Sequence, residues 1–226
     1  MQTTNKLEKL FTNKDLLKLA LTHKSWINEH ENGKVTNERL EYLGDAVLEL
    51  AVSEELYLRF PDKEEGFLTT LRSNLVNTTN LTKIAKKLKL GELLLLAKGE
   101  EETGGRNNPS LLANTTEAVI GALYLDQGME KTRKFIETHL FSDIDKKIKK
   151  PLKDPKSRLQ EYAQNKGFHA PSYKVVSQTG PDHDKTFVIN VFVNDKVWGK
   201  GKGESKSKAA QKAAKDALTK HLEKSS

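Results

Sequence analysis

Residues 111–125 (LLANTTEAVIGALYL) constrain the fold most, because they predict a helix that is apolar on almost every side. Such a helix presents no face to water, so it must lie inside a domain with other elements packed around it. Asn114 and Glu117 are its polar exceptions and, three residues apart, they project from the same face. Gly121 lies on that face as well, where the missing side chain lets a neighbouring helix approach closely. A buried carboxylate must be paired or must bind a cation, because burying it bare costs too much free energy.

Residues 37–50 (NERLEYLGDAVLEL) predict an amphipathic helix that carries a line of acids. At about 100° per residue, Glu38, Glu41 and Asp45 fall within roughly 60° of arc. The opposite side gathers the apolar side chains Leu40, Leu43 and Val47. A charged outer face is also ordinary for a helix at a protein surface, so this segment by itself does not specify a site.

A metal site is predicted where these two helices face each other. Glu41, Asp45, Asn114 and Glu117 then surround a small space lined with oxygen atoms. Carboxylate and amide oxygens suit a hard divalent ion, Mg²⁺ or Mn²⁺, rather than zinc. The chain has no cysteine that would offer a softer ligand.

Four stretches of the chain carry a resemblance to a known family. NERLEYLGDAV (37–47) resembles the signature of bacterial ribonuclease III, and the resemblance extends to ALTHKSW (20–26), FPDKEEG (60–66) and LLANTTEAVIGALYLDQG (111–128). It implies a Mg²⁺-dependent endonuclease for double-stranded RNA, with Mn²⁺ as a substitute. The family acts as a homodimer with one site per strand of the duplex. It processes structured precursors such as ribosomal RNA and leaves 5′-phosphates and two-nucleotide 3′ overhangs.

The resemblance also implies a role for each acid. Asp45 and Glu117 would be the catalytic residues, Glu41 and Asn114 would complete the metal shell, and the secondary acids near the RNA or the dimer interface would be Glu38 and Glu65. Many members of the family have Asp where this chain has Asn114. An amide oxygen still ligates a hard cation, but the site loses one negative charge, so weaker metal binding is expected.

Charge is distributed unevenly along the chain. Residues 1–150 hold 23 basic and 23 acidic residues, whereas residues 151–226 hold 15 basic and 8 acidic ones. The whole positive excess of +7 therefore lies in the last third. A module that binds a polyanion, joined to a neutral domain, explains this asymmetry.

Two prolines mark the predicted boundary between an all-α catalytic domain (1–150) and a second domain (151–226). Pro151 and Pro155 follow a charge run, so the last helix of the first domain should stop near Lys150. Apolar residues recur at helical spacing over residues 7–26 and 68–90, which predicts helices there. Residues 97–110 are rich in Gly, Asn and Glu and predict a loop, with Ser110 capping the helix that follows.

The second domain is predicted to have the order α-β-β-β-α, which makes the chain an α+β multidomain protein. A short helix over residues 156–167 precedes two β-rich runs within 170–194 and a third strand within 197–204. An alanine-rich helix over residues 205–222 then presents a thin face that suits close packing on a sheet. This order, with GPDH (180–183) between the first two strands, resembles the double-stranded RNA-binding domain.

Three regions of RNA contact follow from that second resemblance. Gln160 and Gln164 would meet 2′-hydroxyls in one minor groove and His183 would meet a second minor groove, while Lys206 and Lys208 would bind the phosphates between them. A lysine on an exposed helix face is also ordinary, and this simpler reading is preferred for two further lysines of the last helix, Lys212 and Lys215.

Two other functions stay open on the sequence alone. One is a non-cleaving RNA-binding or scaffold protein, against which the intact acids argue. The other is a DNA nuclease, which is disfavoured because the C-terminal module resembles one that reads A-form geometry. The first residues lack the apolar core of a signal peptide, and no apolar run approaches the roughly 20 residues that span a membrane. The expected compartment is the cytoplasm.

Overall fold

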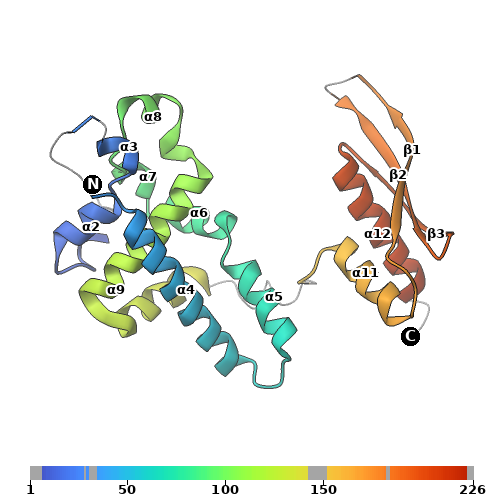
Figure 1. Ribbon diagram of the computed structural model, residues 1–226, viewed down its shortest axis with the longest axis horizontal. Helices are drawn as coiled ribbons and strands as arrows, with labels where there is room; N and C mark the ends of the chain where they lie inside the picture. The colour runs from blue at the N-terminus through green and yellow to red at the C-terminus, as the bar shows by residue number, and fades with distance from the viewer. Residues whose placement is uncertain (1–6, 28, 31–34, 142–151, 182–183, 223–226) are drawn as a thin grey trace. The chain divides into compact units, whose positions relative to one another are not determined.

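The computed structural model describes residues 7–27, 29–30, 35–141, 152–181 and 184–222, and the chain divides into two compact units, Met1–Lys150 and Pro151–Ser226 (Figure 1). The elements described in the first unit are helical: α2 (Lys14–Ala20), α3 (Lys24–Ile27), α4 (Glu38–Arg59), α5 (Glu65–Leu75), α6 (Thr78–Lys87), α7 (Leu90–Leu93), α8 (Lys98–Glu102), the 3₁₀ turn η1 (Gly105–Asn107) and α9 (Pro109–Leu140). The second unit contains α11 (Pro155–Asn165), β1 (Ser172–Thr179), β2 (Thr186–Val193), β3 (Lys196–Gly203) and α12 (Lys206–Leu222). The predicted fold class, an all-α domain followed by an α-β-β-β-α domain, is confirmed.

Helix α9 forms the centre of the first unit, as its apolar sequence predicts. Its residues from Ala118 to Leu123 are all buried. A Cβ atom built on Gly121 would lie only 2.2 Å from the carbonyl oxygen of Leu40 on α4, so the two backbones touch. On another side, the Thr116 hydroxyl donates a hydrogen bond to the Leu81 carbonyl of α6 (3.2 Å). The helix is interrupted at Gly128, which has φ 78° and ψ 177°.

The segment 97–110 is more ordered than the predicted loop, since it contains α8 and η1. Arg106 holds it in place by donating through Nη1 to the carbonyls of Gly91 and Leu94, both at 2.9 Å. Its Nε also donates to Glu101 (2.6 Å). Such long-range bonds leave no trace in local composition.

The predicted cap of α9 was wrong by two residues. The side chain of Asn108, and not of Ser110, accepts hydrogen bonds at the helix start, from the backbone nitrogens of Ser110 and Leu111. Pro109 is the first helical residue, a position that suits its fixed φ and its missing N–H, so the cap must precede it. The predicted helix end near Lys150 falls outside the described residues.

The second unit is an antiparallel sheet with strand order β1-β2-β3, covered on one face by α11 and α12. Five alanines of α12 are buried against the sheet: Ala209, Ala210, Ala213, Ala214 and Ala217. Gly201 on β3 permits this approach, since a Cβ there would lie 2.2 Å from the Ala209 carbonyl oxygen. Leu159 of α11 and Ile189 and Val191 of β2 complete the core.

None of the helices in the described part of the chain is both long enough and apolar enough to cross a bilayer.

Candidate metal centre and RNA-binding surfaces

Helices α4 and α9 bring the four predicted metal ligands together. The carboxylates of Glu41 and Asp45, one turn apart on α4, both interact electrostatically with Glu117 on α9. The side chain of Asn114, one turn before Glu117, hydrogen-bonds the Glu41 carboxylate. Asp45 is exposed and the other three are partly buried, so the group lies at the edge of the helix contact, open to a ligand.

Burial and mutual repulsion raise the pKa of two of these acids. Burial, followed by the charges of Asp45 and Glu41, raises the pKa of Glu117 to about 7. Burial and the charge of Glu38 also raise the pKa of Glu41, against the opposing effect of its hydrogen bond from Asn114. A cation placed among these oxygens would relieve the repulsion, which is the electrostatic condition that a metal site requires.

The acids are close, but they do not yet enclose an ion. In the part of the chain that the structure describes, no three Asp, Glu, His or Cys side chains converge tightly enough to surround a metal. Like charges repel one another, so side-chain rotations are needed to turn the oxygens inward around a cation. The donor set itself, three carboxylates and one amide, fits Mg²⁺ or Mn²⁺.

Glu38 lies beside this group but is held by other partners. Lys24 Nζ lies 3.4 Å from Glu38 Oε1, and the Thr36 hydroxyl donates to Glu38 Oε2 at 3.1 Å. Glu38 also contributes to the raised pKa of Glu41, so it borders the predicted ligands. It is exposed and therefore positioned as an outer acid.

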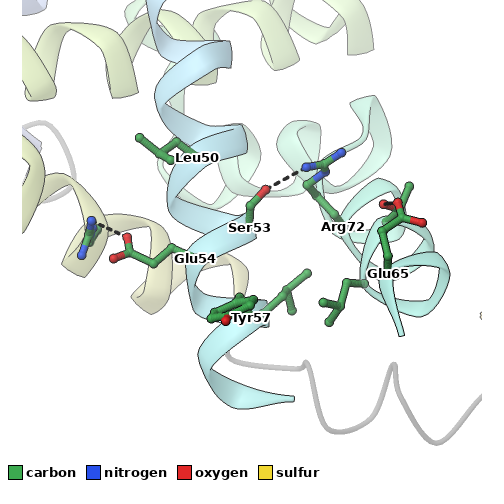
Figure 2. A pocket seen from close by; sticks show the side chains of 10 residues that line it. Leu50, Ser53, Glu54, Tyr57, Glu65 and Arg72 are labelled. Atoms are coloured by element: carbon green, nitrogen blue, oxygen red, sulfur yellow. Dashed lines mark hydrogen bonds and ion pairs between the residues drawn. The ribbon is translucent and has the colours of Figure 1, made fainter. Parts of the chain in front are cut away.

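Glu65 lies in a different place from the four ligands. It begins α5 and lines a pocket of about 620 Å³ between α4 and α5, with Tyr57 and Arg72 among its neighbours (Figure 2). The Thr69 hydroxyl donates to Glu65 Oε1 at 2.7 Å. Arg72 reaches across the pocket to α4, where it donates to the Ser53 hydroxyl (2.8 Å) and pairs with Glu49 (2.8 Å).

An exposed apolar stripe on α4 is a feature that the sequence analysis missed. Tyr42, Leu50 and Tyr57 are 82%, 56% and 70% exposed. Spacings of eight and seven residues place them on one side of the helix, within about 80° of arc. Large apolar side chains gathered at a surface mark an interaction site. The same periodicity that predicted the acids would have shown this stripe.

The predicted RNA contacts of the first helix lie on its exposed side. Gln160 and Gln164 are both exposed on α11, one turn apart, while the preceding residues Leu159 and Ala163 point into the core. Asp154 caps this helix by accepting from the backbone nitrogens of Lys156 (3.0 Å) and Ser157 (3.3 Å). His183 lies outside the described residues.

The two lysines at the start of α12 are exposed and differ in their contacts. Lys206 Nζ lies 6.0 Å from the centroid of the Phe187 ring. Lys208 forms an ion pair with Glu204, and its backbone nitrogen donates to the Ser205 hydroxyl at 3.1 Å. Lys206 is therefore the freer of the two for an RNA phosphate.

Comparison with known proteins gives two family matches. Residues 13–144 match a Ribonuclease-III-like family model, and residues 155–221 match the double-stranded RNA binding motif. Ribonuclease 3 of Bacillus licheniformis is 47% identical over 93% of this chain and 85% of its own length. Ribonuclease 3 of Geobacillus kaustophilus is 48% identical over 95% of this chain and 87% of its own.

Solved structures agree with these matches. A nuclease domain of ribonuclease III from Campylobacter jejuni aligns with 67% of this chain and 99% of its own, with 40% identity and a TM-score of 0.56. A second structure of that domain, described as flexible in the region of dimer formation, is 44% identical over 59% of this chain and 96% of its own, with a TM-score of 0.54. The chain belongs to the ribonuclease III family.

Proposed function

We propose that this protein is a Mg²⁺-dependent endonuclease that hydrolyses both strands of double-stranded RNA. One observation carries the proposal: the acids of α4 and α9 interact with one another in a chain that also contains a double-stranded RNA binding motif. Residues 1–150 would form the catalytic domain and residues 151–226 the RNA-binding domain. Following the bacterial relatives, we infer a cytoplasmic enzyme that processes ribosomal RNA and other structured precursors.

The roles of the site residues follow from their chemistry. Bound Mg²⁺ supplies a Lewis acid that makes a water nucleophilic and stabilises the charge on the leaving oxygen. Glu41, Asp45 and Glu117 hold it through carboxylate oxygens, and Asn114 contributes an amide oxygen. Glu117 must release its proton to act as a ligand, which its pKa of about 7 allows near neutral pH. Glu38, held by Lys24, remains at the edge as a secondary acid.

The C-terminal domain would supply most of the affinity. Gln160 and Gln164 project from α11 and Lys206 and Lys208 from the start of α12, which are two of the three regions through which such domains contact RNA. The recognition is of A-form shape over about 16 base pairs rather than of sequence.

We infer further that the protein is a homodimer whose contact includes α4. Its stripe of Tyr42, Leu50 and Tyr57 and the adjoining pocket offer apolar surface that a second copy would cover. Glu65 would then lie at the dimer interface. One site per strand would give products with 5′-phosphates and two-nucleotide 3′ overhangs.

Digestion of long duplex RNA with Mg²⁺, with and without EDTA, tests the proposal. We expect cleavage that EDTA abolishes and that Glu117→Gln abolishes without loss of duplex binding. Binding without any cleavage by the wild type would favour the scaffold alternative. Equal competition by duplex DNA would favour a DNA nuclease.

A further inference from the structure

The sheet of the second unit has an outer face, which we define as the side away from α11 and α12. Ile189 and Val191 of β2 are buried in the core with these helices, and Tyr173 of β1 packs against it. Successive side chains in a strand alternate between faces. Asn190 and Phe192 of β2 and Lys174 of β1 therefore project from the outer face.

The strand register places three lysines around Asn190 on this face. Asn190 pairs with Lys174 on β1 and with Lys200 on β3, so a lysine flanks it on both sides. Lys202 pairs with Val188, the next outward residue of β2. Neighbouring strands are about 4.8 Å apart and alternate residues about 7 Å, so the three lysine stems arise within roughly 12 Å of one another.

Among the residues that the structure describes, no acid offsets these cations on the outer face. Its remaining described residues are uncharged: Ser172, Ser177, Thr179, Thr186, Val188, Phe192 and Val197. Among the described residues, no carboxylate pairs with Lys174, Lys200 or Lys202. Asp216 accepts from the backbone nitrogen of Lys200 (2.9 Å), but its carboxylate pairs with Lys220 of its own helix. The face is therefore a concentrated patch of positive charge.

An aromatic ring lies beside the cations. Lys174 Nζ is 5.1 Å from the centroid of the Phe192 ring, which is partly exposed in the central strand. Lysines on β1 and β3 also protect edge strands against aggregation, which is the simpler explanation for each one alone. That explanation requires neither an aromatic ring on the central strand nor a face whose described residues include no acid.

We propose that the outer face binds a single-stranded RNA segment that flanks the duplex substrate. Cations that follow a backbone, together with an aromatic ring on which a base stacks, are the combination by which proteins bind single-stranded nucleic acid. The predicted duplex contacts among the described residues lie on α11 and at the start of α12, on the other side of the sheet. A rigid duplex held there does not reach the outer face, whereas a flexible strand does. An acidic peptide would pair with the lysines but would have no base to stack on the Phe192 ring.

The test compares a blunt duplex of about 16 base pairs with the same duplex carrying a single-stranded extension of roughly ten nucleotides. Affinity is measured in EDTA, so that no cleavage occurs. The wild type should bind the extended RNA more tightly. Lys200→Gln/Lys202→Gln should abolish that gain, lower the salt slope for the extended RNA by about 1.4 and leave blunt-duplex binding unchanged. Lys212→Gln/Lys215→Gln, which removes the same charge from α12, should retain the gain.

Two single substitutions distinguish the contribution of the Phe192 ring to RNA affinity from the contribution of the lysine charges. Phe192→Leu should weaken binding of the extension about fivefold, with blunt-duplex affinity unchanged. Asn190→Asp keeps the side-chain shape but places an acid between Lys174 and Lys200, so it should remove the gain from the extension. Its charge-matched control is Lys215→Gln, which should have no such effect. The proposal is overturned if the extension gives no gain, or if the β3 double variant weakens both RNAs equally.

Discussion

Gly44 on α4 and Gly121 on α9 meet backbone to backbone. A Cβ atom on Gly44 would lie 2.9 Å from the nitrogen of Gly121, and one on Gly121 would lie 3.0 Å from the nitrogen of Gly44. Gly44 would also meet the carbonyl oxygen of Glu117 at 1.8 Å. Two glycines thus set the separation of the helices that carry the acids.

A single methyl group at this contact should force the helices apart. Gly44→Ala should destabilise the first unit by about 3 kcal/mol and abolish cleavage, because the backbone it meets is not free to move aside. Gly66→Ala is the control. A Cβ atom there would have nothing within 4 Å, and replacing a helical glycine by alanine should not destabilise the protein. Thermal melting of both variants measures the difference, and equal melting temperatures would show that the contact is loose.

Restoring the commoner residue at position 114 should change the metal dependence. Asn114→Asp adds a negative charge beside Glu41 and Glu117, which strengthens Mg²⁺ binding and raises repulsion when the ion is absent. The Mg²⁺ concentration for half-maximal cleavage should fall, and the melting temperature in EDTA should not rise. Identical Mg²⁺ titrations for the two proteins would mean that residue 114 is not a ligand.

The raised pKa of Glu117 predicts how metal-free stability depends on pH. The folded protein holds the Glu117 proton up to a pKa of about 7, above the ordinary 4.5. The favourable contribution of the protonated Glu117 side chain to the free energy of unfolding is therefore complete below about pH 4.5. It is lost as pH rises through about 7. In EDTA at pH 8, Glu117→Gln should stabilise the protein by about 1 kcal/mol after allowance for solvent screening, with little effect at pH 5. A gain of the same size at both values would contradict this.

Asp154 should stabilise the second unit through its cap. It accepts from the Ser157 hydroxyl (2.7 Å) and from Gln211 Nε2 (2.8 Å), and its pKa is lowered to about 2, chiefly by the Ser157 bond. This stabilisation is present above about pH 4 and is lost as pH falls toward 2. Asp154→Ala should cost about 1 kcal/mol at neutral pH. Asp154→Asn keeps an acceptor and should retain most of the stability without its acid dependence, as denaturant unfolding at pH 7 and pH 3 would measure.

Helical periodicity was enough to anticipate the centre of the first unit. It placed Asn114 and Glu117 on one face of a buried helix, and it put Gly121 where another helix passes. Both statements need only the 3.6-residue repeat and the cost of burying charge. The α-β-β-β-α order could also be predicted, because alternating apolar and polar residues indicate strands whereas alanines at helical spacing indicate a helix.

Other features depend on tertiary contacts that periodicity does not contain. Arg106 orders its segment through carbonyls more than ten residues earlier in the chain. Glu65 lies away from Glu41 because α5 is a separate helix whose direction is set by packing on α4. The cap at Asn108 was within reach of the sequence, since Pro109 marks the first helical residue.

A titration of Mn²⁺ binding, monitored by electron paramagnetic resonance in the absence of RNA, tests the metal site most directly. Glu117→Gln and Glu65→Gln make the same chemical change, one between α4 and α9 and the other in the pocket beside α5. We predict that Glu117→Gln weakens Mn²⁺ binding about tenfold or more, whereas Glu65→Gln binds as the wild type does. Undiminished binding by Glu117→Gln, or equal weakening by both variants, would contradict a metal centre built by Glu41, Asp45, Asn114 and Glu117.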